Sequence, residues 1–170
     1  MANLELHPVH SVSLVPLRVR FGETDLMGIV HHGSYVLYFE AARVSWLRRR
    51  GVTYQTWAAA GIHLPVVDID IQYKRPAKFD DELIIETTLS QVTAATITFS
   101  YRILRHDTPG STAITDATVL TTGSTRLACV GDSPDGSHAG HGGGHTVRRI
   151  PESVKSVLVL KEDSRLGSMP

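Results

Sequence analysis

A long amphipathic segment, residues 34–50, is the feature that most restricts how this chain can fold. Ser34 is a residue type that commonly caps the start of a helix, and Gly51 suits the left-handed position that follows a helix end. Between them, apolar side chains recur at helical spacing and form one broad stripe, namely Tyr35, Val36, Phe39, Ala41, Ala42, Trp46 and Leu47. We therefore expect a helix that starts near Ser34, ends before Gly51 and has a face wide enough to be wrapped by a sheet.

The rest of the chain supplies strands for such a sheet. Five stretches are rich in Val, Ile, Thr and Leu and are separated by turn-forming residues, namely residues 12–21, 67–73, 83–92, 96–104 and 117–130. Residues 67–73 alternate strictly, which predicts a strand with one buried face. Shorter helices are predicted at residues 53–60, stopped by Gly61, and at residues 151–160, where Pro151 suits the first helical position. One long helix followed by closely spaced strands predicts an α+β fold, with an antiparallel sheet curled around a central helix.

Composition limits the classes of function. The chain has 170 residues, enough for one domain, and its 17 Lys and Arg balance its 17 Asp and Glu, so no overall field favours nucleic acid or a membrane surface. We see no secretion signal and no run of roughly 18 apolar residues that could span a membrane. Cys129 has no disulfide partner and is expected to be a small buried hydrophobic residue. We therefore expect a cytoplasmic protein with no membrane insertion and no nucleic acid partner.

We expect a single domain over residues 12–160, with flexible termini at residues 1–11 and 161–170. It is interrupted by a segment rich in glycine and histidine, residues 131–145, which is predicted to be a mobile loop. Three imidazoles in this loop could in principle bind a metal ion, namely those of His138, His141 and His145. Because the loop offers no rigid frame with acidic or thiol partners, we expect no metal site.

The chemistry is concentrated just before the long helix, where Asp25 lies in a loop that contains Gly28. The first turn of a helix leaves backbone N–H groups unpaired and carries the positive end of the helix dipole, so it favours negative charge in front of it. An oxyanion that develops during acyl transfer is such a charge. With Asp25 as a base or nucleophile, the segment holds both halves of an acyl-transfer site. An aspartate at this place can also be a loop residue that only accepts backbone hydrogen bonds.

The pattern Thr24-Asp25-x-x-Gly28-x-Val30-x-His32-x-x-Tyr35-x-x-x-x-Glu40-x-x-Arg43 resembles the signature of the acyl-CoA thioesterases related to 4-hydroxybenzoyl-CoA thioesterase. The likeness covers roughly residues 14–160 and includes Tyr73-Lys-Arg-Pro76, Asp80-Asp81-Glu82, Thr125-Arg-Leu127 and Ile150-Pro-Glu152. It implies a hotdog fold, in which a five-stranded antiparallel sheet curls around the long helix. It also implies hydrolysis of an acyl-CoA to a free carboxylic acid and coenzyme A, with no metal or organic cofactor.

The resemblance assigns roles to the residues around the loop. It makes Asp25 the catalytic carboxylate, and it makes the backbone N–H of His32 the group that polarises the thioester carbonyl. The His32 imidazole is a candidate for orienting Asp25 or a water molecule. His31 stands where relatives carry an aromatic residue, so we expect it in the pocket wall. Gly28 is expected to permit a backbone turn that a Cβ would obstruct.

The remaining candidates for substrate binding are Tyr35, Glu40, Lys74, Arg75, Arg148 and Arg149. Tyr35 is expected mainly to pack, and the resemblance places Glu40 near the partner subunit's share of the site, where a structural ion pair is an equal alternative. These four cations, together with Lys78, suit the phosphates of the nucleotide, although each can also be only a surface charge. A single curled sheet leaves an exposed edge strand and a half-closed pocket, and the resemblance implies a homodimer or homotetramer with sites at the interface.

Three alternatives stay open from the sequence. Asp25 either attacks the thioester carbonyl or deprotonates the water that attacks it. The carrier of the acyl group is coenzyme A or an acyl carrier protein. A chain with this fold can also bind acyl-CoA without turning it over.

Overall fold

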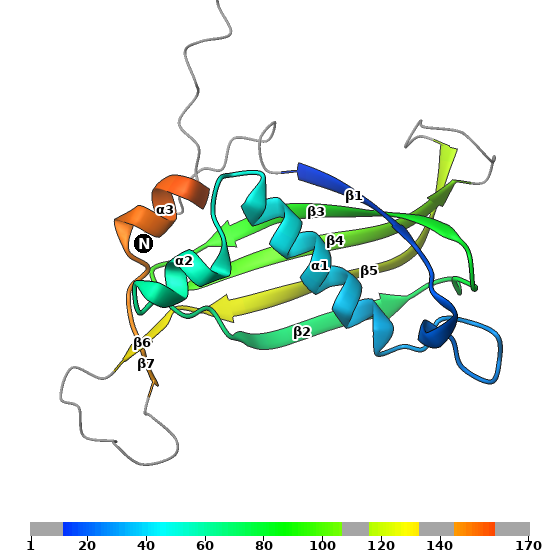
Figure 1. Cartoon of the computed structure of the whole chain (residues 1–170), viewed down its shortest axis with the longest axis horizontal. Coiled ribbons are helices and arrows are strands. Elements are labelled where there is room, and N and C mark those ends of the chain that lie inside the picture. The colour runs from blue at the N-terminus through cyan, green and yellow to red at the C-terminus, as the bar shows by residue number, and fades with distance from the viewer. Residues whose placement is uncertain (1–11, 107–115, 133–144, 159–170) are drawn as a thin grey trace, which may run out of the picture.

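The computed structural model describes residues 12–106, 116–132 and 145–158, and its centre is a five-stranded antiparallel sheet (Figure 1). The strands are β1 (Val12–Arg18), β2 (Val66–Tyr73), β3 (Glu82–Val92), β4 (Thr96–His106) and β5 (Ala117–Ala128). They lie side by side in the order β1-β3-β4-β5-β2, so β1 and β2 form the two edges. The predicted α+β fold with five antiparallel strands is confirmed.

The long helix α1 (Ser34–Arg48) lies across one face of this sheet (Figure 1). Phe39 stacks on Tyr101 of β4 with ring centroids 4.2 Å apart, and Trp46 meets Phe99 edge to face at 5.2 Å. Both helix side chains are fully buried, so the aromatic part of the predicted stripe forms the core. The buried stripe is narrower than predicted, because Val36 is half-buried and Ala41 is exposed.

Glycines lie just beyond the C-terminal ends of the first two helices, and a threonine caps the start of the second. Gly51 and Gly61 have φ of +74° and +66°, as predicted for residues that terminate the first and second helices. The second helix, α2 (Tyr54–Ala59), is capped by Thr53, whose Oγ1 accepts a hydrogen bond from the Thr56 N–H at 3.2 Å. Ser34 is the first helical residue and caps nothing, because its hydroxyl donates instead to the Glu23 carbonyl at 3.2 Å.

Strand β2 departs from the prediction of one buried face. Its apolar side chains alternate as expected, yet Val67, Ile69 and Tyr73 are 55%, 42% and 51% exposed. Only Ile71 of this row packs partly against the core. The reason is the place of β2 at the edge of the sheet, where the described part of the chain supplies a neighbour on one side only.

The C-terminal part of the described chain lies at the opposite end of the sheet from the start of α1 (Figure 1). Here β6 (Val130–Asp132) pairs with β7 (His145–Val147), and α3 (Glu152–Leu158) follows. Pro151 directly precedes α3, where its carbonyl accepts the Val154 N–H at 3.0 Å, and is not the first helical residue.

The predicted loop over residues 131–145 therefore begins and ends in this short ladder. Its residues 133–144, with His138 and His141, lie outside the described residues, as do residues 1–11 and 159–170. Cys129 is fully buried, as predicted. Among the described helices, none is long and apolar enough to cross a membrane.

Candidate active site

Asp25 lies in a tight turn between a short 3-10 helix, η2 (Phe21–Glu23), and α1. Its carboxylate accepts a hydrogen bond from the Met27 N–H at 2.8 Å, and its carbonyl accepts from the Gly28 N–H at 2.9 Å. Gly28 has φ of +73°, which favours glycine. This is the backbone turn that we predicted a Cβ would obstruct; a Cβ on Gly28 would meet no other atom within 4 Å, so the obstacle is the positive φ itself and not a lack of space.

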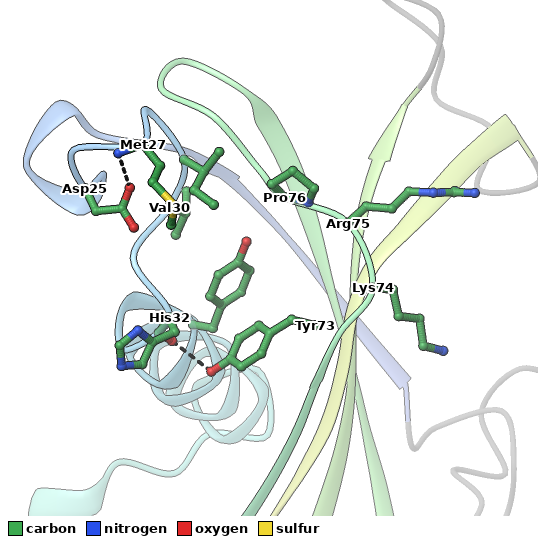
Figure 2. Close-up of a pocket in the computed structure, with 10 residues that line it drawn as sticks. Asp25, Met27, Val30, His32, Tyr73, Lys74, Arg75 and Pro76 are labelled. Carbon is green, nitrogen blue, oxygen red and sulfur yellow. Dashed lines mark hydrogen bonds between the residues drawn. The ribbon is translucent and has the colours of Figure 1, made fainter.

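A cavity of about 290 Å³ opens beside this turn, between the start of α1 and the end of β2 (Figure 2). Five predicted site residues line it, namely Asp25, His32, Tyr35, Lys74 and Arg75. Five further residues line it that the sequence reasoning did not select, namely Met27, Ile29, Val30, Tyr73 and Pro76. The structure thus brings the Asp25 turn, the helix start and the segment after β2 to one place.

The backbone N–H of His32 has no hydrogen-bond partner within the described parts of the chain. The two amides that follow are occupied: Gly33 donates to His31 Nδ1 at 3.1 Å, and Ser34 donates to the His31 carbonyl at 2.9 Å. The predicted oxyanion donor is therefore the one amide of these three that is free to bind a ligand. The His32 imidazole is exposed and lies 4.0 Å from the His31 ring, and among the described contacts no hydrogen bond joins it to Asp25.

Two tyrosines form the wall between the helix start and β2. The Tyr73 hydroxyl donates to the His32 carbonyl at 3.0 Å, as Figure 2 shows. Burial raises the pKa of Tyr73, which keeps this hydroxyl protonated as a donor. Tyr35 is buried, its ring lies 5.3 Å from that of Tyr73, and its hydroxyl accepts the Ala77 N–H at 3.3 Å. The sequence signal for Tyr73 was its place at the head of the Tyr73–Pro76 motif.

The predicted phosphate-binding cations are not all near the cavity. Lys74 and Arg75 lie at its rim, although their side chains extend away from Asp25 in Figure 2. Arg148 lies at the far end of the sheet, where its Nη2 donates to the Gly61 carbonyl at 3.0 Å, and the exposed Arg149 follows it. This chain alone does not bring Arg148 and Arg149 to the cavity, because β7 and α3 hold them at the other end of the fold.

Two more predicted site residues face elsewhere. Glu40 is exposed on α1 and does not line the cavity. His31 lines a separate depression of about 810 Å³, which the Asp25 turn also borders. Gly28 and Asp25 also line this depression, and at its edge Phe21 and Phe79 meet edge to face at 5.8 Å. Asp25 therefore borders both hollows.

Glu23 is a residue that the sequence reasoning missed. Its buried carboxylate accepts hydrogen bonds from the Arg20 N–H at 2.8 Å, from Arg20 Nε at 2.7 Å and from the Tyr38 hydroxyl at 2.7 Å. Burial on its own raises the pKa of Glu23, but the bonds from Arg20 and Tyr38 together outweigh it and lower the pKa below its ordinary value. The available signal was an acidic residue two positions before Asp25.

The arrangement suits acyl transfer. Asp25 and His32, the residue with the free backbone amide, line one cavity, and His32 lies just before the first turn of α1, where negative charge is stabilised. Within the described residues, no group of three or more His, Cys, Asp or Glu side chains is arranged to hold a metal ion.

Comparison with known proteins gives consistent results. A family model described as the thioesterase-like superfamily matches residues 19–158. The acyl-CoA thioesterase YbgC of Haemophilus influenzae is 39% identical over 92 residues, which are 54% of this chain and 68% of that protein. The crystal structure of the hypothetical protein TT1821 from Thermus thermophilus is 32% identical, with a TM-score of 0.68 over 86% of this chain and 95% of that chain. The 4-hydroxybenzoyl-CoA thioesterase of Pseudomonas sp. strain CBS-3 is 20% identical, with a TM-score of 0.70 over 86% of this chain and 99% of that chain, which shows the hotdog fold alone.

Proposed function

This chain belongs to the thioesterase-like superfamily, and we propose that it hydrolyses the thioester of an acyl-CoA to a free carboxylic acid and coenzyme A. Relatives whose names describe acyl-CoA thioester hydrolysis support this activity, among them YbgC of Haemophilus influenzae. One observation of the site carries the proposal. Asp25 and His32, whose N–H is unpaired within the described chain, line the same cavity at the start of α1.

In the proposed reaction, the thioester carbonyl oxygen faces the His32 N–H, and Asp25 acts on the carbonyl carbon. As nucleophile, the carboxylate bonds to that carbon and the C–S bond breaks, which gives a mixed anhydride that water then hydrolyses. As general base, the carboxylate takes a proton from water while the water oxygen bonds to the carbon; the C–S bond then breaks, and the proton passes from the carboxylate to the departing thiolate. In both routes the negative oxygen lies at the positive end of α1, where it is stabilised.

The rim of the cavity provides for the rest of the substrate. Lys74 and Arg75 are exposed beside it, and their flexible side chains reach phosphate groups of coenzyme A if they turn toward the cavity. We propose a cytoplasmic setting, because acyl-CoA is an intracellular metabolite.

We also propose that the protein is a homodimer, or a homotetramer built from such dimers. The exposed apolar row of β2, Val67 and Ile69 with Tyr73, supports this, because it lies on an edge strand that has a free side for a second copy. Tyr73 belongs both to this row and to the cavity, so a partner on β2 would close the open side of the site.

Release of free thiol from a panel of acyl-CoA thioesters tests the function. Asp25→Asn keeps an oxygen that accepts the Met27 N–H but removes the charge, so we expect kcat to fall by at least about two orders of magnitude with the fold intact. His32→Ala keeps the backbone donor and should cost less. If Asp25→Asn retains wild-type turnover, Asp25 is not catalytic. The same panel on an acyl carrier protein tests the choice of carrier.

A single turnover in isotopically labelled water separates the two roles of Asp25. If an anhydride forms and water attacks the enzyme's carbonyl, mass analysis finds label in the Asp25 carboxylate. If label appears only in the released acid, two routes remain: general base catalysis, or an anhydride that water attacks at the acyl carbon.

A further inference from the structure

Glu23 has contacts that the proposed reaction does not use, and they join the Asp25 turn to α1. Besides its carboxylate, its backbone carbonyl is engaged: it accepts the His31 N–H at 2.8 Å and the Ser34 hydroxyl at 3.2 Å. His31 directly precedes His32, and Ser34 begins α1. Together with Tyr38 on the next turn of the helix, three groups at the helix start converge on Glu23.

The short segment from Glu23 to Asp25 is itself held firmly. Thr24, the residue between them, uses both its N–H and its hydroxyl to bond the Phe21 carbonyl, at 3.2 and 2.8 Å. Thr24 also pairs with Val30 across the turn, and the Asp25 N–H donates to the Ile29 carbonyl at 2.9 Å. A displacement of Glu23 is therefore passed on to Asp25, because little freedom remains between the two residues.

We propose that Glu23, held by Tyr38, is a positioning residue that fixes the Asp25 carboxylate relative to the His32 N–H. This inference rests on the proposed thioesterase function, in which those two groups act on one carbonyl. Misplacing a reacting group by about 1 Å can lower a rate by up to about a hundredfold, so a contact that sets this spacing has an effect on turnover. A contact that only stabilises the fold would leave turnover by the folded molecules unchanged.

Tyr38→Phe is the most direct test, because it removes one hydroxyl from a fully buried ring and changes nothing else. On the best acyl-CoA of the panel, we expect kcat to fall about tenfold and KM to stay within about threefold of wild type. In an Asp25→Asn background, Tyr38→Phe should lower the residual rate by less than about twofold, because the hydroxyl acts through Asp25. Glu23→Gln is the second variant and should reproduce both results.

Tyr101→Phe is the matched control. Tyr101 is equally buried on β4, and its hydroxyl bonds Arg43 at 3.3 Å and Thr125 at 2.8 Å, in the core and not in the cavity lining. Like Tyr38→Phe, the Tyr101→Phe variant loses a hydroxyl that bonds a charged side chain. We therefore expect a similar loss of stability in the two variants, but kcat of Tyr101→Phe should stay within about twofold of wild type. Thermal unfolding of every variant shows that each is folded at the assay temperature.

The outcomes separate this inference from the proposed function. If the wild-type protein releases no thiol from any substrate, the function itself fails before any variant is compared. If the wild type is active and Tyr38→Phe matches it, the positioning role is wrong. The role is also wrong if Tyr101→Phe lowers kcat as much, or if Tyr38→Phe costs the same factor with and without the Asp25 carboxylate.

Discussion

Replacing Gly123 with alanine tests how closely the backbone of β2 and the Phe39 ring on α1 approach β5. A Cβ at this position would lie 2.5 Å from the Asp70 carbonyl oxygen on β2 and 2.7 Å from Cε2 of Phe39 on α1. Real Cβ atoms essentially never come closer than 3.0 Å to such neighbours, so the backbone of β2 or the Phe39 ring must move. Neither moves freely, because Asp70 is held in the strand ladder and Phe39 is buried against Tyr101.

Overpacking of a well-filled core costs about 1–3 kcal/mol. Because both obstacles at Gly123 are rigid, we expect the upper end, about 3 kcal/mol of unfolding free energy, for Gly123→Ala. In a chain of this length, each kcal/mol lowers Tm by about 2–4 °C, which gives a decrease of about 6–12 °C. Urea and thermal unfolding followed by tryptophan fluorescence measure it, at one fixed protein concentration.

Gly22→Ala is the control for this substitution, because a Cβ on Gly22 meets nothing within 4 Å and its φ is not in the left-handed region. We expect its stability to stay within about 0.5 kcal/mol of wild type. If Gly123→Ala proves as stable as Gly22→Ala, then β2 and Phe39 do not approach β5 as closely as described, and the argument from contact distance is refuted.

Two further predictions concern assembly and pH. Ile69→Lys should convert the proposed dimer to monomers in light scattering, whereas Val147→Lys on β7, where the valine is 66% exposed against 42% for Ile69, should not. An unchanged mass for Ile69→Lys would rule out the β2 interface. The pKa of Glu23 is lower in the folded state than its ordinary value of 4.5, so its contribution to stability is complete above that pH and is lost as the pH falls through the folded-state value. Tm measured from pH 6 downward should therefore fall less steeply for Glu23→Gln than for wild type, and parallel curves would contradict the described bonds.

The helices and strands were predictable because their signals are local. Spacing of apolar residues over residues 34–50 marked α1, and Gly51 and Gly61 marked the ends of two helices through the backbone angle that each position needs. The Asp25 turn was located for the same reason, since Asp25, Gly28 and His32 are close in sequence. The catalytic use of the carboxylate and of the His32 amide, which the residues alone leave open, comes from the family resemblance and stays a prediction.

The misses share a different cause, which is dependence on groups far away in sequence. The alternation of β2 predicted which side chains share a face, but burial depends on what covers that face, and β2 lies at an edge. Ser34 has the composition of a cap, yet its hydroxyl bonds Glu23, eleven residues earlier. Tyr73 reaches His32 over a separation of 41 residues. Arg148 donates a hydrogen bond to the Gly61 carbonyl, and no pattern in the neighbouring sequence predicts that contact.

The order of strands in the sheet also has a consequence for how the site is assembled during folding. Strands β3, β4 and β5 each pair with the next strand in the sequence. Strand β2 precedes all three, and within the described chain it pairs only with β5, where Val66 lies opposite Leu127. Contacts of such long sequence separation form slowly, because the entropy cost of closing a large loop comes before the favourable contact energy is gained. The cavity wall that Tyr73 provides is thus completed only after β5 is in place. During synthesis, all five strands of the sheet must therefore leave the ribosome before Tyr73 can take its place in the cavity opposite the Asp25 turn.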